Sequence, residues 1–329
     1  MPVRTLRDII RHGAEAYGSQ TAFRYKVKKE IVDRTYLDVD RDSMAVSRMV
    51  ESMGMEGKHI ALIGTTTYQW IVSYFGIVGS GSVAMPIDAR LPADPVCELL
   101  ERADVEMLIF DEIRRDVAEA VKEKCPSVRY ILSMQAEEAA DGVQSLSMLM
   151  ALHAGEYEKE LSGDQLATIL FTSGTTGKSK GVMLSHRNLV DNAVCLDMKI
   201  PAGTISMTLL PINHVYCLTM DIIKGLHIGL VICINDSIMH VQRNMKLFKP
   251  EIVLLVPLVI ESIYGKLKDA GSLIPKKMVA KAAFGGNLRI ICSGGAYLDP
   301  DYVDKFKEYG ITILQGYGMT ECSPVISTN

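Results

Sequence analysis

The sequence lacks the patterns by which common zinc sites, secreted disulfide-rich domains and membrane-spanning proteins are recognised. Its seven cysteines form no CxxC pair and its seven histidines form no HxxH or HExxH spacing, which argues against a zinc site. The apolar run IVLLVPLVI at 252–260 is far shorter than the roughly 18–20 residues of a membrane span and is broken by Pro257. The odd cysteine count, and an N-terminal stretch with an amphipathic helix pattern in place of a secretory leader, predict a reducing, cytoplasmic environment.

A strong charge of either sign is also missing. The 329 residues contain 35 Lys and Arg against 39 Asp and Glu, a formal net charge of -4. This balance gives no general attraction to nucleic acid or to an anionic membrane. The 48% hydrophobic content is enough to fill the core of two packed subdomains.

Short β-branched runs alternate with stretches of helical periodicity, which predicts an α/β fold with mainly parallel sheets. The predicted strands of the first half are 59–64, 83–87, 106–111 and 128–133, and the helices between them are 68–81, 94–103 and 116–124. A second series of strand-like runs follows: LATILFT, TISMTLLP, LVICI, IVLLVP, LRIICS and ITIL. The polar, small-residue segment 133–149 is interpreted as a loop or linker, which gives approximate lobes at 1–140 and 141–329.

The stretch FTSGTTGKSKG at 171–181 has the composition of a phosphate-binding loop. A Walker loop needs a glycine, four residues and then Gly-Lys-Ser/Thr. Here the position five before Gly177 is Thr172, and the nearest upstream glycine, Gly174, is only three residues away. The spacing therefore excludes a P-loop NTPase. What remains is a hydroxyl-rich turn between two glycines, with Lys180 available as a point charge for a phosphate.

Three further stretches narrow the interpretation: LLPINHVYC at 209–217, SGGA at 293–296 and LQGYGMTECSP at 314–324. In order and spacing they resemble the adenylate-forming superfamily, which comprises acyl-CoA synthetases, luciferases and the adenylation domains of peptide synthetases. The segment 68–88 is similar to a framework segment of that family, so the resemblance spans nearly the whole chain. One departure is Ser179, where the family usually has proline.

The resemblance implies two stacked, mainly parallel sheets with flanking helices, and an enzyme that joins a carboxylate to the α-phosphate of ATP before passing the acyl group to a thiol. It implies that ATP, Mg²⁺ and the co-substrate CoA are used. The residues implied to bind the β- and γ-phosphates are Thr172, Ser173, Gly174, Thr175, Thr176, Gly177 and Lys180. Those implied at the adenine and α-phosphate are Gly295, Gln315, Gly316, Tyr317 and Thr320, and Glu321 is the implied Mg²⁺ ligand.

Each of these residues also has a purely structural interpretation. Without its neighbours Tyr317 would be taken as a core tyrosine and Glu321 as a surface carboxylate. A lone histidine after a strand, such as His214, is more often a packing residue than a catalyst. The resemblance instead implies a place for His214 beside the substrate carboxylate and α-phosphate, with Lys180 and Thr320 as its partners in catalysis.

The nature of the acid follows from one position. Peptide-synthetase domains have an aspartate directly after the position matching His214, and here that position is Val215. This argues against an α-amino acid, and the stretch 284–306 is more similar to the long-chain branch, so we expect a medium- or long-chain fatty acid. No nucleic acid and no transmembrane segment are expected. Peripheral membrane contact and an oligomer are left open.

The motifs that follow in the family are a Thr-Gly-Asp sequence and a small C-terminal domain that bears a lysine used in adenylation. Neither is present in the 329 residues, which end at SPVISTN in a strand-like run. We therefore expect a truncated N-terminal adenylation domain that is inactive alone. Two alternatives stay open: an acyl-AMP ligase that loads an acyl carrier protein, and a non-catalytic nucleotide or acyl binder.

Overall fold

The computed structural model describes residues 3–172, 179–196, 198–269 and 274–329. The chain forms two compact units, and each is described by itself. The first comprises residues 1–19, 35–191 and 211–214, and the second comprises 20–34, 192–210 and 215–329. The units are thus interleaved along the sequence, while the lobes at 1–140 and 141–329 stay a prediction.

A seven-stranded sheet forms the centre of the first unit, with strand order β7-β6-β5-β3-β4-β8-β9. Among the described residues of this sheet, the strands pair in parallel except β8 with β9, which are antiparallel. Its strands are β3 (His59–Ile63), β4 (Val83–Ile87), β5 (Val105–Phe110), β6 (Tyr130–Ser133), β7 (Gln144–Ser145), β8 (Leu166–Thr172) and β9 (Lys180–Ser185). Its helices are α1 (Leu6–Tyr17), α2 (Tyr36–Ser52), α3 (Tyr68–Gly79), α4 (Ala93–Arg102), α5 (Arg115–Lys124), α6 (Leu146–Leu152) and α7 (His186–Cys195), the last of which continues into the second unit.

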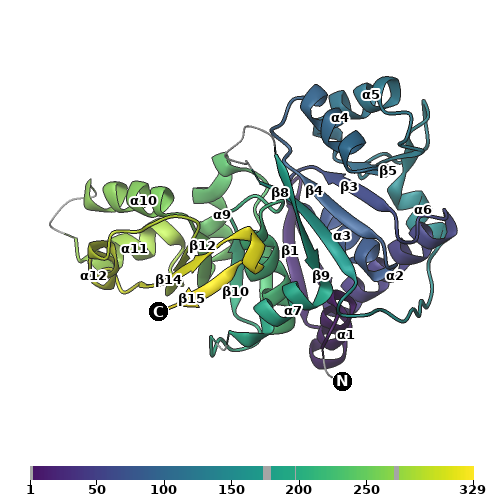
Figure 1. Cartoon of the computed structure of the whole chain (residues 1–329). Helices are drawn as coiled ribbons and strands as arrows, with labels where there is room; N and C mark the ends of the chain where they lie inside the picture. Colours follow the sequence, from purple (N-terminus) through teal and green to yellow (C-terminus); the bar gives the residue numbers. More distant parts are fainter. Residues whose placement is uncertain (1–2, 173–178, 197, 270–273) are drawn as a thin grey trace. The chain divides into compact units, whose positions relative to one another are not determined.

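Helices lie on both faces of this sheet, as Figure 1 shows for α4 and α5 on one side of β3, β4 and β5 and for α2 and α3 on the other. Apolar side chains of these strands that point to one face, such as Ala61 and Met85, pack in one core with Val96 and Val117 of α4 and α5. Strands covered on both faces read as continuous hydrophobic runs, which is why the sequence pattern identified them.

Local signals fix where helices begin. Thr5 and Thr35 each accept a hydrogen bond from the backbone N–H of an aspartate three residues on, and that aspartate bonds back to the threonine N–H. These reciprocal bonds satisfy N–H groups that have no partner within the helix, so they stabilise the first turns of α1 and α2.

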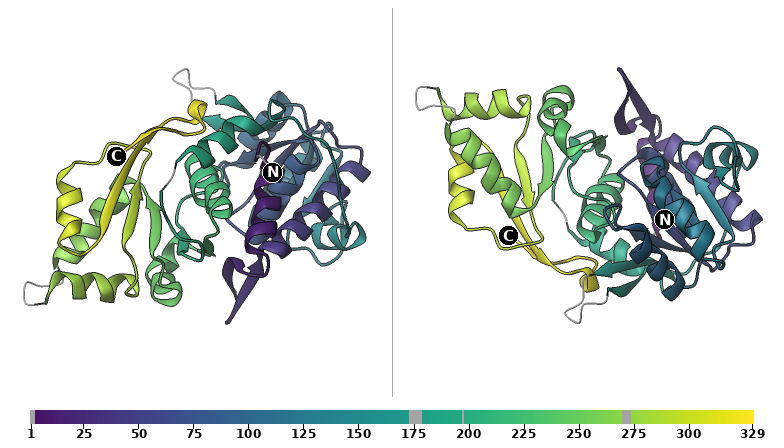
Figure 2. Two further views of the ribbon diagram at one scale, coloured as in Figure 1. Left: turned by 90° about the horizontal axis from the view of Figure 1, so that it is seen from below. Right: turned by 90° about the horizontal axis from the view of Figure 1, so that it is seen from above.

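The second unit contains an eight-stranded sheet of order β15-β14-β13-β12-β10-β11-β1-β2. Its strands are β1 (Thr21–Val27), β2 (Glu30–Thr35), β10 (Ile205–Thr208), β11 (Val231–Ile234), β12 (Ile252–Leu255), β13 (Ile290–Ser293), β14 (Thr312–Gly318) and β15 (Val325–Thr328). Its helices are α8 (Lys224–His227), α9 (Val241–Phe248), α10 (Pro257–Asp269), α11 (Lys276–Phe284) and α12 (Asp301–Lys307). Figure 1 shows α10, α11 and α12 around β12 and β14, and Figure 2 shows β14 and β15 side by side as one ribbon. This ribbon is antiparallel, whereas β10 to β14 pair in parallel.

The predicted α/β class, with two mainly parallel sheets and flanking helices, is confirmed. The interpretation of 133–149 as a loop is wrong in part. Gln144 and Ser145 form β7, which pairs with β6, and Leu146 begins α6. The Ser145 side chain accepts a hydrogen bond from the Met148 N–H and so caps this helix. Among the described helices, none combines the length and the apolar character needed to cross a lipid bilayer.

Candidate active site

The residues singled out from the sequence are divided between the two units. Thr172, Lys180 and His214 belong to the first unit, and the boundary falls directly after His214. The second unit contains the remaining described candidates, which are Gly295, Gln315, Gly316, Tyr317, Thr320 and Glu321. The predicted phosphate ligands Ser173, Gly174, Thr175, Thr176 and Gly177 lie outside the described residues.

In the first unit the phosphate-loop motif coincides with the connection between β8 and β9. These strands are antiparallel, and Thr172 is the Cα partner of Lys180, so the two residues flank the base of the connection. β8 is buried along its centre, while Lys180 is exposed. The Ser179 carbonyl accepts a hydrogen bond from Arg102 Nη2 at 3.0 Å, which fixes the end of the connection to the end of α4.

Asp88 lies at the same edge of this sheet. β4 and β8 are parallel with Ala84 opposite Thr168, and Asp88 directly follows β4 at the end of the sheet where Thr172 ends β8. Arg90 binds the Asp88 carboxylate in a fork, with Nε–Oδ1 at 3.0 Å and Nη2–Oδ2 at 2.7 Å. The hydrogen bonds from Arg90 hold the pKa of Asp88 below its usual value.

His214 ends a turn in which its N–H donates to the Pro211 carbonyl at 3.1 Å. Its side chain is exposed at the surface, yet the surrounding protein desolvates the ring enough to lower its pKa. The charge of Asp88 acts in the opposite direction, and that of Arg90 adds to the lowering. The lowered pKa favours the neutral imidazole, which is the form that can accept a proton or a hydrogen bond.

In the second unit the candidates gather at the carboxyl ends of β13 and β14. These strands are parallel, with Ser293 opposite Gln315, and the SGGA turn begins where β13 ends. A Cβ on Gly294 would lie 2.8 Å from the Tyr216 ring, so only glycine fits there. Gly295 has φ +83°, a backbone conformation that also favours glycine. A Cβ on Gly316 would meet its nearest atom, the Ser293 carbonyl oxygen, at 3.7 Å, which is ordinary contact.

Tyr317 is 63% exposed, so its interpretation as a core tyrosine is wrong. It lies in the β14–β15 ribbon opposite Ser327, close to where the pairing register shifts. An exposed aromatic ring beside glycines leaves its face free for stacking on a planar ligand.

The turn after β14 carries Thr320 and Glu321 in a short 3₁₀ helix, η4 (Thr320–Cys322). Glu321 is exposed. The Met319 N–H donates to the Pro324 carbonyl at 2.9 Å, and the Ser323 N–H donates to the Thr320 carbonyl at 3.1 Å. The turn is thus closed by its own backbone.

Asn192 of α7 holds this turn from outside. Its Nδ2 donates to the carbonyls of Cys322 at 3.0 Å and Val325 at 2.8 Å, and its Oδ1 accepts from the Val325 N–H at 3.1 Å. A single amide therefore fixes both ends of the segment that follows Glu321. Asn192 was not predicted from the sequence, because no local pattern marks a contact between residues 130 positions apart.

Asp88 and Arg90 were missed as well, although a signal exists for Asp88. It follows directly after the buried strand β4, at the carboxyl end where polar groups of parallel sheets meet ligands. The described residues contain no group of three or more His, Cys, Asp or Glu side chains arranged for a metal.

Comparison with known proteins adds three findings. The family model described as AMP-binding enzyme matches residues 10–329. The long-chain-fatty-acid–[acyl-carrier-protein] ligase AEE15 of Arabidopsis thaliana is 23% identical over 98% of this chain and 56% of its own length. The long-chain-fatty-acid–CoA ligase FadD15 of Mycobacterium bovis is 24% identical over 91% of this chain and 58% of its own length.

Among solved structures, the anthranilate CoA ligase AuaEII in complex with anthranoyl-AMP matches with a TM-score of 0.87 and 19% identity. The match covers 100% of this chain and 62% of that one. At this identity the likeness concerns the fold alone. The chain spans less than two thirds of the length of these relatives.

Proposed function

The chain belongs to the AMP-binding enzyme family, and from that premise we propose that it is the nucleotide- and acyl-binding part of an enzyme that activates a fatty acid. A carboxylate oxygen attacks the α-phosphate of ATP, the bond to the bridging oxygen of the β-phosphate breaks, and pyrophosphate leaves. The sulfur of a thiol then attacks the acyl carbonyl carbon, the bond from that carbon to the phosphate oxygen of AMP breaks, and the acyl thioester forms as AMP leaves and the thiol proton is released.

The observation that carries the proposal is the shared carboxyl edge of β13 and β14. It combines a glycine at φ +83° (Gly295), a polar strand end (Gln315) and an exposed aromatic ring (Tyr317). In parallel sheets, nucleotides bind outside the carboxyl ends of the strands. In this proposal Tyr317 stacks on adenine, Gly295, Gln315 and Gly316 line the wall beside the base, and Thr320 contacts the α-phosphate.

Glu321 is the proposed ligand for Mg²⁺. An exposed carboxylate fits a cation that prefers oxygen donors, keeps several waters, and is usually held by one or two carboxylates together with substrate phosphates. When bound, Mg²⁺ would neutralise charge that develops on the phosphates. Asn192 would hold the turn so that Glu321 keeps its position.

The first unit supplies the remaining proposed contacts. Lys180 and Thr172, with residues 173–177, would bind the β- and γ-phosphates and stabilise the leaving pyrophosphate. His214, kept neutral, would donate or accept a hydrogen bond at the substrate carboxylate or α-phosphate. The charges of Asp88 and Arg90 act on the pKa of this ring in opposite directions.

The proposed acid is a medium- or long-chain fatty acid. Val215 is a buried, apolar side chain and offers no carboxylate to a substrate ammonium group. The names of the two relatives from Arabidopsis thaliana and Mycobacterium bovis support the same acid class. The proposed acceptor is CoA.

An acyl carrier protein is the second candidate acceptor. The relative from Arabidopsis thaliana is named as a ligase of long-chain fatty acids to the acyl carrier protein, and it matches 98% of this chain. The residues discussed above concern adenylate formation, which precedes both transfers, so they favour neither acceptor.

Calorimetric titration of this chain with two non-hydrolysable acyl-adenylate mimics tests the proposal. One mimic carries a dodecanoyl group and the other an α-aminoacyl group. We expect tight binding of the dodecanoyl mimic and weak binding of the aminoacyl mimic. A preference for the aminoacyl mimic would overturn the proposed acid class, and binding of neither mimic, nor of AMP, would overturn the proposed function of this chain.

A further inference from the structure

A small cavity lies inside the second unit, between the sheet and the segment that follows Tyr216. Its volume is about 30 Å³, which is enough to hold one water molecule or a group of similar size. Twelve residues line it: Met198, Ile200, Ser206, Tyr216, Met220, Asp221, Lys224, Ile228, Leu230, Ile252, Leu254 and Cys292. Most of these are apolar, so the few polar groups stand out.

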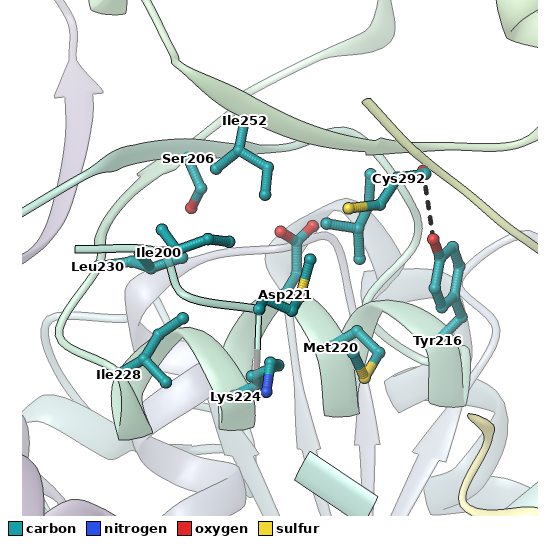
Figure 3. Close-up of a pocket in the computed structure, with 12 residues that line it drawn as sticks. Ile200, Ser206, Tyr216, Met220, Asp221, Lys224, Ile228, Leu230, Ile252 and Cys292 are labelled. Carbon is teal, nitrogen blue, oxygen red and sulfur yellow. Dashed lines mark hydrogen bonds between the residues drawn. The ribbon is translucent and has the colours of Figure 1, made fainter. Parts of the chain in front are cut away.

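Two polar side chains at this cavity are buried, and each has one oxygen without a hydrogen-bond partner among the described residues. Asp221 is 1% exposed, and its Oδ1 has no hydrogen-bond partner among the described residues. Ser206 is also 1% exposed, and its Oγ is likewise unpaired among those residues. Figure 3 shows the Asp221 carboxyl group pointing into the space between Ser206 and Cys292. Leaving such groups unpaired costs about 1–3 kcal/mol each, so each is expected to bond to a water or to a polar group of a ligand in the cavity.

The backbone that carries Asp221 is unusual too. Residues Cys217–Ile223 form a π-helical turn, η2, which continues into α8. π-helical turns are rare and are found frequently at functional sites. This is an observation independent of the cavity and of the unpaired groups.

The charges at the cavity favour an uncharged ligand group. Burial raises the pKa of Asp221 to about 8, so its carboxyl group is largely neutral at pH 7. Lys224, on the same wall, is buried and donates to the carbonyls of Ala193 and Leu196. An ammonium group of a ligand would lose its hydration in this cavity and would lie near the positive charge of Lys224. Both effects oppose the binding of a cationic ligand.

The cavity shares a wall with the proposed nucleotide site. Tyr216 lines the cavity, its ring packs on Gly294, and its hydroxyl donates to the Cys292 carbonyl at 3.2 Å. Cys292 and Gly294 lie at the end of β13 and in the turn that leads to Gly295. An acyl chain joined to an adenylate at that turn is therefore close to the cavity.

Resting on the proposed function, we propose that this cavity receives a hydroxyl group carried on the chain of the acyl substrate, with Asp221 and Ser206 as specificity-determining residues. A hydroxyl group has one donor and two acceptor positions, so it satisfies both side chains at once. Its size matches the cavity. Met198 and Met220 are flexible side chains that can change rotamer to admit the chain that carries it.

Titration of this chain with a series of dodecanoyl-adenylate mimics tests the inference. One mimic is unsubstituted, and the others carry a hydroxyl near the carbonyl, at the middle or at the far end of the chain. We expect one hydroxylated mimic to bind about ten-fold or more tightly than the unsubstituted one. Asp221→Leu should abolish or reverse that preference, because the leucine side chain cannot form a hydrogen bond with the ligand hydroxyl. Ser206→Ala should reduce the preference several-fold.

Thr219→Val is the matched control. Thr219 is on the same π-helical turn and has a buried, unpaired hydroxyl among the described residues, but it does not line the cavity. This variant should keep the wild-type preference. Equal binding of all mimics, or an unchanged preference in Asp221→Leu and Ser206→Ala, would overturn the inference and leave the proposed function intact. If the chain binds AMP but none of the acyl mimics, the inference is also overturned. If it binds neither AMP nor any acyl mimic, the proposed function is overturned.

Discussion

Thr172 and Lys180 are Cα partners across the antiparallel pair β8–β9, so one residue with a hydroxyl group and one with an ammonium group flank the connection 173–179. Lys180 is exposed, and its backbone is held in register by the pairing of β9 with β8. A side chain placed in this way is available to a phosphate.

The first prediction concerns this lysine. Lys180→Ala should weaken ATP binding by about ten- to a hundred-fold, the effect of losing one charged hydrogen bond, while leaving stability nearly unchanged. Titration calorimetry with ATP measures the affinity. Lys29→Ala, at the exposed turn after β1, is the control and should bind ATP like the wild type. Equal affinities for the two variants would remove Lys180 from the proposed phosphate contacts.

The second prediction concerns Glu321. In the wild type, Mg²⁺ should increase the affinity for ATP. In Glu321→Gln this increase in affinity should be about ten-fold smaller, because a neutral amide is a poor ligand for a hard cation. The measurement is a pair of ATP titrations, with Mg²⁺ and with a chelator. Glu261→Gln on α10 removes an exposed carboxylate elsewhere in the same unit and should keep the full gain. A full gain in Glu321→Gln would contradict the assignment.

The turn that holds Glu321 gives the third prediction. Asn192→Ala removes three hydrogen bonds to Cys322 and Val325, so Mg²⁺-dependent ATP binding should weaken by about ten-fold and the free energy of unfolding should fall by about 1–3 kcal/mol. Asn188→Ala on the same helix removes a bond to the Ser185 N–H and should cost stability only. If both variants bind ATP equally well, Asn192 has no positioning role.

The sequence predicted the strands well, because β3 and β4 are covered on both faces and therefore read as apolar runs. It also identified the exposed Tyr317 through its neighbours. What it missed depends on distant contacts. Asn192 acts on residues 130 and more positions away, and α6 was hidden in a polar segment whose cap, Ser145, is effective only once β7 has joined β6.

His186 leads to a prediction about pH. It is fully buried, burial lowers its pKa from 6.5 to about 4, and its Nδ1 accepts a hydrogen bond from the Leu6 N–H at 3.2 Å. Between these two pKa values the unfolded chain binds a proton that the folded chain does not. Stability should therefore fall as the pH drops from about 6.5 to about 4, by on the order of 3 kcal/mol in total.

Urea unfolding at a series of pH values measures this slope. His186→Gln keeps an acceptor for the Leu6 N–H but cannot titrate, so the dependence on pH in this range should become flatter. His153→Gln, which alters a half-buried histidine of the same unit, is the control and should keep the wild-type slope. An unchanged slope in His186→Gln would assign the acid sensitivity to other groups.

The only tryptophan allows stability to be separated from ligand binding. Trp70 of α3 is 1% exposed and stacks on Tyr74 with ring centroids 5.8 Å apart. Trp70→Phe leaves part of this volume unfilled, so the free energy of unfolding should fall by about 1–3 kcal/mol. Affinity for ATP per folded molecule should not change, because the side chain is enclosed by the core of the first unit. Circular dichroism in urea and ATP titration of the same samples measure the two quantities. Leu152→Ala, at a 76% exposed position on α6, is the control and should change neither the stability nor the affinity for ATP. A ten-fold loss of ATP affinity in fully folded Trp70→Phe would show that this core residue also shapes the binding site.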